Sequence, residues 1–325
     1  MTNYKKRLII GTRGSKLAIA QTTGFIEKLI KVYPDISGNN IETKIIKTSG
    51  DQNQSIRLDQ MGGKGLFAKE IEKEILNQSI DIGIHSMKDL PATEDKEELS
   101  IGCWLERFDP RDALLSNQNI TFHELSKPAV VGTSSIRRRS QVLNLRKDIS
   151  IQVLRGNVDT RIQKLNEGKY DAIILSLAGL QRLKLDHLIT HCLSTDDFLP
   201  ASCQGAVGVQ YNTSNQELES FLAPLNHKTT ERVCLAEREV LKYIKANCNS
   251  PIGLLAEEKD NKIIMNCEIF DHSGNKIFSD SMTKNLNESI QLGQNMGEKV
   301  LNSLGQKLIN ELDNLKDDFD YTSKN

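Results

Sequence analysis

The sequence has no apolar run long enough to cross a membrane, which takes about 18 residues. Its first ten residues, MTNYKKRLII, hold an apolar run of only three, so we expect no signal peptide and a protein that stays in the cytoplasm. Aromatic residues make up 5% of the chain, and the net charge is −1. These values favour neither a nucleic-acid-binding protein nor one that binds a membrane surface.

Paired cysteine motifs are also missing. The six cysteines are scattered along the chain, with no CxxC pair and no Cys/His cluster at zinc spacing. We therefore expect reduced thiols and no bound metal. The P-loop pattern GxxxxGK[ST] is absent as well, so a P-loop nucleotide site is not supported.

The sequence does contain a local excess of positive charge. Residues 127–169 hold ten Lys or Arg and three Asp or Glu, within a chain that is close to neutral as a whole. Such a segment can be a solvated helix face. Several of these arginines, however, fall where a strand is expected to pass into a helix, and this position favours an anion site.

An internal repeat predicts the architecture. Two stretches, RLIIGTRGSKLAIAQ from Arg7 and AVVGTSSIRRRSQV from Ala129, each indicate a short strand, a Gly-Thr turn, a serine and a helix. A second strand, a helix and a third strand follow each of them. A β-α-β-α-β order that occurs twice is typical of two α/β lobes with mainly parallel sheets. We expect two similar lobes of the periplasmic-binding-protein type, with a cleft at the carboxyl ends of the strands.

The pattern changes after about residue 226. The segment KTTERVCLAEREVLKYIKA predicts an amphipathic helix, and three strand-like runs and a final helix over about residues 288–312 follow it. We expect a first α/β lobe (1–105 with 204–224), a second α/β lobe (106–203) and a small α+β C-terminal domain (225–325).

The motif GTSSIRRRSQ combines hydroxyl groups with arginines at an expected helix start. Thr133, Ser134 and Ser135 offer hydroxyls and free backbone N–H groups at the positive end of the helix, where anions bind. Arg137 and Arg138 follow in the first turn, where cations oppose the helix dipole unless an anion is bound. The alternative is a serine N-cap followed by surface arginines.

More arginines stand at other expected strand ends. They are Arg13 in GTRGS, Arg155 and Arg161 in LRGNVDTR, and Arg182 in LQRL. Arginine binds carboxylates and phosphates through two parallel hydrogen bonds. So many arginines predict a ligand with several carboxylates, or a polyphosphate.

Two further motifs are expected near the cleft. GIHSMKDLP places Lys88 and Asp89 after a buried strand, where Asp89 could stabilise a cation; a helix cap or a structural Lys–Asp pair is the alternative. QMGGKGLFAKE is glycine-rich and is typical of a loop that covers a cleft, with Lys64 and Phe67 projecting from it. The alternative there is an ordinary loop with Phe67 in the core.

The last motif is NCNSPIG, in the C-terminal domain. Cys248 lies in a turn between two asparagines, and a thiolate in this position could hold a ligand covalently. An inert thiol fits the same spacing.

Together these motifs resemble the porphobilinogen deaminase family. Nine motifs occur in the family's order between about residues 7 and 312: GTRGSKLA, GGKGLF, HSMKDLP, DPRDAL, GTSSIRR, LRGNVDTR, YDAIILSLAGLQRL, QGAVGV and NCNSPIG. The resemblance implies a transferase of tetrapyrrole (heme) biosynthesis that condenses four porphobilinogen molecules into 1-hydroxymethylbilane and releases ammonia. It also implies a dipyrromethane cofactor joined to Cys248 by a thioether, and a monomer whose partners are porphobilinogen and oligopyrrole intermediates.

The resemblance assigns roles by position. Asp89 matches the catalytic aspartate, which bonds to pyrrole N–H groups and stabilises positive charge as ammonia leaves. The residues expected at the cofactor are Ser15, Phe67, Lys88, Thr133, Ser135, Arg137 and Arg138. Those expected at the substrate or the growing chain are Arg13, Arg155, Arg161, Arg182 and Gln204, and Lys64 is expected in a lid.

Some positions depart from the family's pattern. Gln60 precedes MGGKG where a lysine is common, and the turn around Cys248 is Asn-Cys-Asn where glycine is common. Arg139 extends the usual arginine pair, and we expect it to face solvent. A solute-binding protein for a polycarboxylate is the main alternative, because it shares the repeat and the cleft, but it gives no role to Cys248 or to the third domain.

Overall fold

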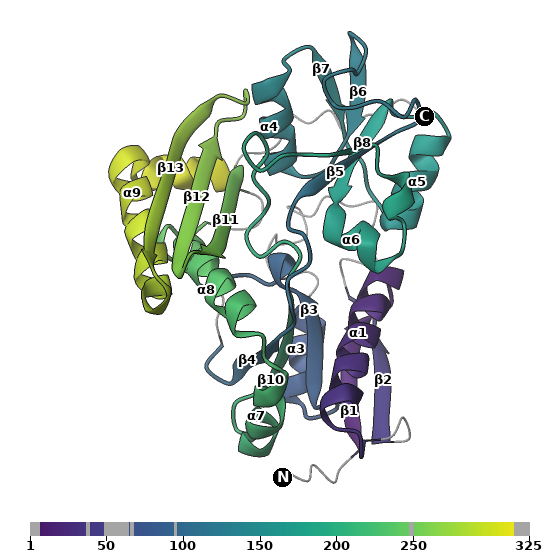
Figure 1. The fold of residues 1–325 in the computed structure, drawn as a ribbon, viewed down its shortest axis with the longest axis vertical. Helices are drawn as coiled ribbons and strands as arrows, with labels where there is room; N and C mark the ends of the chain where they lie inside the picture. The colour runs from purple at the N-terminus through teal and green to yellow at the C-terminus, as the bar shows by residue number, and fades with distance from the viewer. Residues whose placement is uncertain are drawn as a thin grey trace. The chain divides into compact units, whose positions relative to one another are not determined.

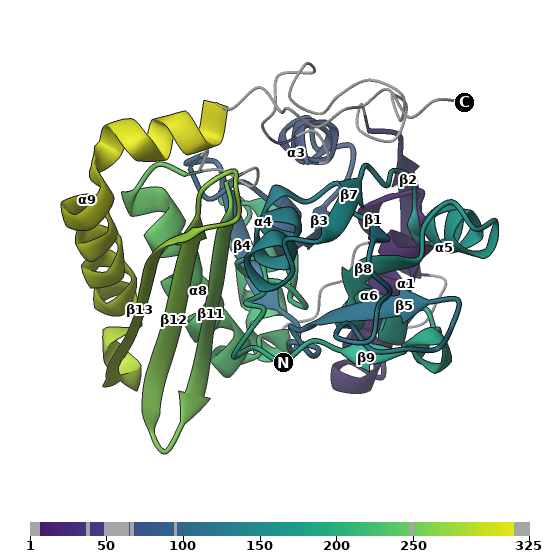
Figure 2. The same ribbon diagram turned by 90° about the horizontal axis from the view of Figure 1, so that it is seen from above.

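A computed structural model describes residues 7–36, 40–48, 65, 68–93, 96–246 and 250–314, with side chains to residue 309 (Figures 1 and 2). Gln60, Lys64, Phe67 and Cys248 lie outside the described residues. The chain divides into two compact units, Met1–Phe108 with Gly205–Glu231 and Asp109–Gln204 with Arg232–Asn325. The finer division into three domains, with a third from residue 225, stays a prediction.

The first unit contains a five-stranded sheet in the order β2-β1-β3-β10-β4. Its strands are β1 (Leu8–Arg13), β2 (Ile41–Ile46), β3 (Ile82–Ser86), β4 (Leu99–Trp104) and β10 (Val207–Asn212). β1 pairs in parallel with β2 and β3, whereas β10 runs antiparallel to β3 and β4. The carboxyl ends of β1 and β3 therefore meet at one edge of the sheet, where a ligand site is expected.

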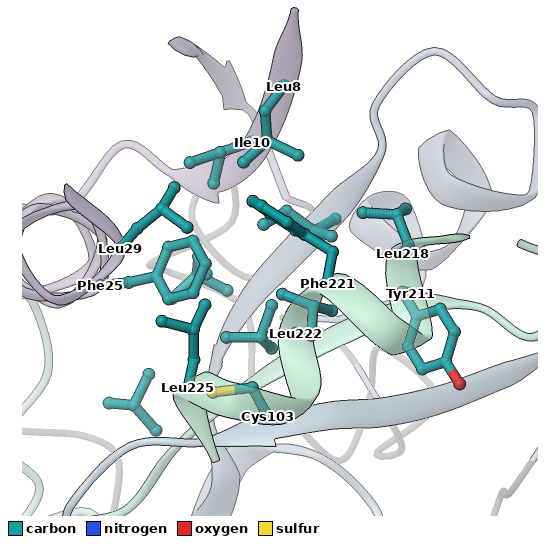
Figure 3. Close-up of a cluster of buried hydrophobic side chains, with 14 residues drawn as sticks. Leu8, Ile10, Phe25, Leu29, Cys103, Tyr211, Leu218, Phe221, Leu222 and Leu225 are labelled. Carbon is teal, nitrogen blue, oxygen red and sulfur yellow. The ribbon is translucent and has the colours of Figure 1, made fainter. Parts of the chain in front are cut away.

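The helices of this unit are α1 (Lys16–Val32), α3 (Lys69–Leu76), α7 (Gln216–Leu222) and the beginning of α8 (Lys228–Tyr243). Phe25 and Leu29 of α1 pack with Phe221 of α7 against Leu8 and Ile10 of β1 (Figure 3). Spacing of three to four residues along α1 places its apolar side chains on this one face. Full burial of each such side chain stabilises the fold by about 1.5–3 kcal/mol.

The second unit repeats the arrangement, with strand order β7-β6-β8-β5-β9. Its strands are β5 (Asp112–Ser116), β6 (Ala129–Gly132), β7 (Ile149–Gln152), β8 (Ala172–Ser176) and β9 (His191–Cys192). β6 pairs in parallel with β7 and β8, and β5 runs antiparallel to β8. The internal repeat is thus confirmed, since each sheet has three adjacent parallel strands and, next to them in the sheet, one strand that runs antiparallel to them. Helices α4 (Ile136–Leu145), α5 (Val158–Asn166) and α6 (Leu177–Arg182) follow the three parallel strands.

The C-terminal part of the second unit is a three-stranded antiparallel sheet with two long helices. Its strands are β11 (Ile252–Lys259), β12 (Lys262–Phe270) and β13 (Lys276–Asn285). The helix α9 (Ser289–Asn314) lies along β13 (Figure 2) and is interrupted at Gly305, where φ is 74°. The three expected strands and the final helix are confirmed, as is the fold class of two similar α/β lobes with a small α+β part. No helix among the described residues is long and apolar enough to span a bilayer.

Candidate active site

A pocket opens in the first unit where β1 and β3 end. Its empty volume is about 490 Å³, which includes open solvent. Four of the predicted site residues line it: Arg13, Ser15, Lys88 and Asp89. The other lining residues are Leu17, Ala18, Gln21, Ala68, Ile84, His85 and Ser86. The parallel pairing of β1 with β3 brings the motifs GTRGS and HSMKDLP together at this pocket.

The first of these motifs is held by a helix cap. Arg13 is the last residue of β1, and Ser15 is the N-cap of α1, where its hydroxyl accepts a hydrogen bond from Ala18 N at 3.2 Å. The first turn of α1 contains no acidic residue. No acidic side chain of α1 therefore neutralises the positive end of the helix dipole. This positive end and the charge of Arg13 both favour a bound anion.

The second motif forms a tight turn directly after β3. Met87, Lys88 and Asp89 make one turn of 3₁₀-helix. The turn is anchored because Met87 is buried and its backbone N–H donates to Ala206 O at 3.1 Å. Lys88 and Asp89 are half-buried on the pocket wall, so a carboxylate and two cations share this small volume.

Two pocket residues received no role from the sequence. Gln21 is buried on the inner face of α1, and its amide donates to Ser86 Oγ at 2.7 Å. His85 is buried within β3, and this burial lowers its pKa to about 4, so the ring is uncharged near neutral pH. The sequence signal that could have identified both residues is a polar side chain at a position that the apolar periodicity assigns to the core.

The second unit gathers hydroxyl groups and arginines after β6. Ser135 is the N-cap of α4, and its hydroxyl accepts from Arg138 N at 3.4 Å. Its own N–H donates to Thr133 Oγ1 at 3.2 Å. The serine N-cap of the alternative interpretation is therefore present, but the surface arginines that went with it are not. Arg137 is 4% exposed and Arg138 is 6% exposed.

Both guanidinium groups are paired with one carboxylate, that of Asp112, which is completely buried. Asp112 Oδ2 lies 2.7 Å from Arg137 Nη2, and Oδ1 lies 2.7 Å from Arg138 Nη2. The side chain of Gln204 donates to Oδ1 at 2.9 Å. Burial alone would raise the pKa of Asp112, but the two arginines and the hydrogen bonds hold it well below its ordinary value. The cluster carries two positive charges and one negative charge.

Asp112 belongs to the motif DPRDAL but received no role from the sequence. It begins β5 and lies opposite Ser176 at the end of β8, so antiparallel pairing brings it to the arginines. Arg139 also differs from expectation. It does not simply face solvent, because its Nη1 donates to His272 O at 2.8 Å in the turn between β12 and β13.

The remaining predicted arginines of this unit lie near the ends of β7 and β8. Arg155 and Arg161 flank the start of α5, and Arg161 Nε donates to Gly156 O at 2.7 Å. Gly156 has a φ of 112°, a conformation that favours glycine, which explains the LRGN turn. Arg182 ends α6, and its partial burial lowers its pKa to about 10, so it stays cationic near neutral pH.

Comparison with known proteins shows the family to which the chain belongs. The family described as "Porphobilinogen deaminase, dipyromethane cofactor binding domain" matches residues 8–220, and "Porphobilinogen deaminase, C-terminal domain" matches residues 231–302. The chain belongs to the porphobilinogen deaminase family. The resemblance carried by the nine motifs is confirmed, and the first matched domain of this family member is the one that binds the dipyrromethane cofactor.

Relatives and solved structures of known identity are also similar to the chain. A porphobilinogen deaminase of Bacillus pumilus is 46% identical over 75% of this chain and 78% of its own. One from Bacillus subtilis is 43% identical over 84% of this chain and 87% of its own. A TRAP periplasmic solute binding protein from Desulfovibrio salexigens has a TM-score of 0.42 at 10% identity, over 69% of this chain and 73% of its own.

Proposed function

We propose that this protein condenses four molecules of porphobilinogen, one at a time, into 1-hydroxymethylbilane, with loss of one ammonia at each addition. One observation carries the proposal. The pocket at the ends of β1 and β3 places the Asp89 carboxylate beside Arg13 and Lys88, within the domain matched by the family.

The chemistry of the substrate suits this pocket. Porphobilinogen carries an acetate, a propionate, an aminomethyl group and a pyrrole N–H. Arg13, Lys88 and the N-terminus of α1 favour its carboxylates. Asp89 can accept a hydrogen bond from the pyrrole N–H and stabilise the positive charge that develops on the ring as ammonia leaves. A fixed carboxylate beside a developing cation lowers the barrier, because little reorganisation is needed at the moment of reaction.

The residues of the chain also fit a dipyrromethane cofactor, which carries four carboxylates. Arg137 Nε is buried and has no hydrogen-bond partner among the described residues, and the Asp112 cluster keeps one uncompensated positive charge. Thr133, Ser135, Arg137 and Arg138 would hold carboxylates in the second unit, and Ser15 and Lys88 would do so in the first. When bound, the cofactor supplies the pyrrole carbon to which the first substrate unit is joined.

The attachment point that we propose is Cys248, in the motif NCNSPIG. This assignment rests on the motif, as do the roles of Phe67 at the cofactor and Lys64 in a lid. Arg155, Arg161, Arg182 and Gln204 are proposed to bind the substrate or the growing chain. A third domain from residue 225 that carries the cofactor, a monomeric state and a cytoplasmic location are also predictions.

Product analysis tests the proposed function. Purified protein incubated with porphobilinogen should form 1-hydroxymethylbilane and release four ammonia molecules for each product molecule. Binding of porphobilinogen without release of ammonia would instead support the solute-binding alternative, and the enzymatic proposal would then be wrong.

A further inference from the structure

His85 lies in the pocket and has no part in the chemistry described so far. Its side chain is 5% exposed, and its Nε2 atom is buried with no hydrogen-bond partner among the described residues. A buried polar atom without a partner is destabilising, because it has lost its hydrogen bonds to water. Its immediate surroundings therefore indicate what this nitrogen is placed to do.

A second unpaired atom lies next to it. In the antiparallel pairing of β3 with β10, Gly208 is opposite His85 and Gln210 is opposite Gly83. Because side chains alternate between the two faces of a strand, His85 and Gln210 are diagonal neighbours on one face. Gln210 Oε1 is also buried without a hydrogen-bond partner in the part of the chain that the structure describes.

Gly83 keeps the space between these two side chains open. A Cβ atom at this position would lie 3.1 Å from His85 Nε2 and 2.5 Å from a methyl carbon of Ile71. Gln210 is close enough to act on the His85 ring as a hydrogen-bonding side chain. Any residue larger than glycine at position 83 would occupy the space beside the ring.

The orientation of the Gln210 amide is decided by Glu72 of α3. Gln210 Nε2 lies 3.3 Å from Glu72 Oε1, and a carboxylate can only accept a hydrogen bond, so the NH₂ group must point toward it. The amide oxygen is then left for His85. An acceptor beside Nε2 requires the proton of the neutral ring to be on Nε2, which leaves Nδ1 as the acceptor nitrogen.

Burial outweighs the nearby groups that favour protonation of the ring. The negative charge of Glu72 is compensated by Lys96, whose Nζ lies 2.6 Å from Glu72 Oε2. Arg13 opposes a positive ring, as does burial itself, and Lys88 adds a further cation to the pocket wall. The Gln210 amide and Asp89 favour a positive ring, as Glu72 does, but burial is the larger effect and keeps the pKa of His85 low. An imidazolium would compete with the substrate cation for the Asp89 carboxylate.

We propose that His85 is a positioning residue, held by Gln210 with its proton on Nε2, so that the ring adds no third positive charge to those of Arg13 and Lys88 beside the Asp89 carboxylate. The role of Asp89 in this inference rests on the proposed function. The tautomer and charge of His85, however, belong to the protein alone and can be measured without turnover.

Nitrogen NMR on the full-length protein labelled with ¹⁵N-histidine tests the tautomer and the charge of His85. The six histidines are assigned with His85→Gln as reference. We expect a neutral ring with the proton on Nε2 from about pH 5.5 to 8, and a mixture of tautomers in Gln210→Met, which keeps the size of the side chain but has no amide oxygen. A ring that is charged at pH 6.5, a proton on Nδ1, or an unchanged tautomer in Gln210→Met would overturn the inference.

Replacing Lys96, which compensates the charge of Glu72, tests whether the charge of the His85 ring affects catalysis by Asp89. Lys96→Met leaves the charge of Glu72 unbalanced, so the titration midpoint of His85 should rise by about one pH unit. The acid limb of kcat should move to higher pH with it. Lys44→Met is the matched control, because Lys44 forms a similar ion pair (2.6 Å) with Glu74 on the same helix.

Each outcome of this second experiment is decisive. An unchanged midpoint in Lys96→Met would refute the link between Glu72 and the ring. A raised midpoint with an unchanged pH profile of kcat would show that the charge of His85 does not matter to Asp89. Loss of the proposed enzymatic function would show instead as absence of product in the wild type, with the NMR result unaffected.

Discussion

Two aspartates show how surroundings decide what a carboxylate can do. Asp89 is half-buried on the wall of a pocket that it shares with Arg13 and Lys88, where a ligand can reach it. Asp112 is completely buried and accepts hydrogen bonds from two guanidinium groups and an amide. The first is placed to act on a substrate, and the second is committed to holding the protein's own arginines.

Replacing Asp89 tests its role at the reacting ring. Asp89→Asn keeps a hydrogen-bond acceptor but removes the negative charge, so kcat should fall on the order of 10²- to 10³-fold, with a small change in KM. Steady-state kinetics provide the measurement. Asp186→Asn, at an exposed position of the second unit, is the control and should leave kcat unchanged. Near-normal turnover in Asp89→Asn would remove Asp89 from the catalytic role.

Replacing Asp112 tests the buried cluster. Asp112→Asn leaves Arg137 and Arg138 without a counter-charge, and such a loss costs about 3–5 kcal/mol of unfolding free energy. Urea unfolding at pH 7 measures this cost. The control is Asp109→Asn, because Asp109 pairs with Arg111 at 2.7 Å in a partly exposed position, where a pair contributes about 0–1 kcal/mol. Equal effects of the two substitutions would contradict the description of the cluster.

The same carboxylate predicts a dependence of stability on pH. The pKa of Asp112 is lower in the folded protein than in the unfolded chain, so its contribution is fully present above the unfolded value. As the pH falls below that value, the unfolded chain takes up the proton first and stability is lost. The difference in unfolding free energy between wild type and Asp112→Asn should therefore narrow between about pH 5 and pH 3. A constant difference would contradict this assignment.

At the scale of elements, one side chain links α8 to two other parts of the second unit. Glu237 is completely buried; it accepts from Ala256 N on β11 at 2.8 Å and from Cys203 N in the segment before β10. Glu237→Gln would turn an NH₂ group toward one of these N–H donors, which should cost about 1–3 kcal/mol in urea unfolding. Glu239→Gln, which alters a half-buried contact with Gln294, is the control and should cost less. Equal costs would argue against this link.

The packing of α9 on α8 depends on a glycine. A Cβ atom at Gly293 would lie 2.4 Å from Ala236 O, a backbone atom that cannot move aside alone. Gly293→Ala should therefore lower the melting temperature, at a cost of about 1–3 kcal/mol. Gly24→Ala, within α1, meets no atom within 4 Å and should instead stabilise by up to about 1 kcal/mol through helix propensity. If both substitutions changed the stability in the same direction, the close approach of α8 and α9 would be contradicted.

At the scale of the whole molecule, local patterns predicted the parallel strands but not their antiparallel neighbours. The repeat identifies β1 to β3 and β6 to β8, because each strand is followed by a helix of its own. Residues 204–224 were expected in the first lobe, but no local periodicity indicates that β10 (207–212) pairs there with β3 and β4, beyond the whole second sheet in sequence.

In the site, too, local patterns predicted the residues at strand ends but not the contacts made through long-range pairing. The strand-end positions of Arg13, Ser15, Lys88 and Asp89 follow from the repeat, and the structure brings these four residues together. The partner of Arg137 and Arg138 does not follow from it, because Asp112 reaches them only through the antiparallel pairing of β5 with β8. Gln204 joins the same cluster from a segment between two strands of different sheets. Charge pairs made through tertiary contacts leave no spacing signal in the sequence.

The most direct test of the central claim is the intact mass of freshly purified, active protein, compared with that of Cys248→Ser. The wild type should be heavier than its sequence by one dipyrromethane group and give the colour reaction of a pyrrole, whereas the variant should show the mass of the chain alone. An active wild type with the bare mass of its sequence would contradict a cofactor anchored at Cys248.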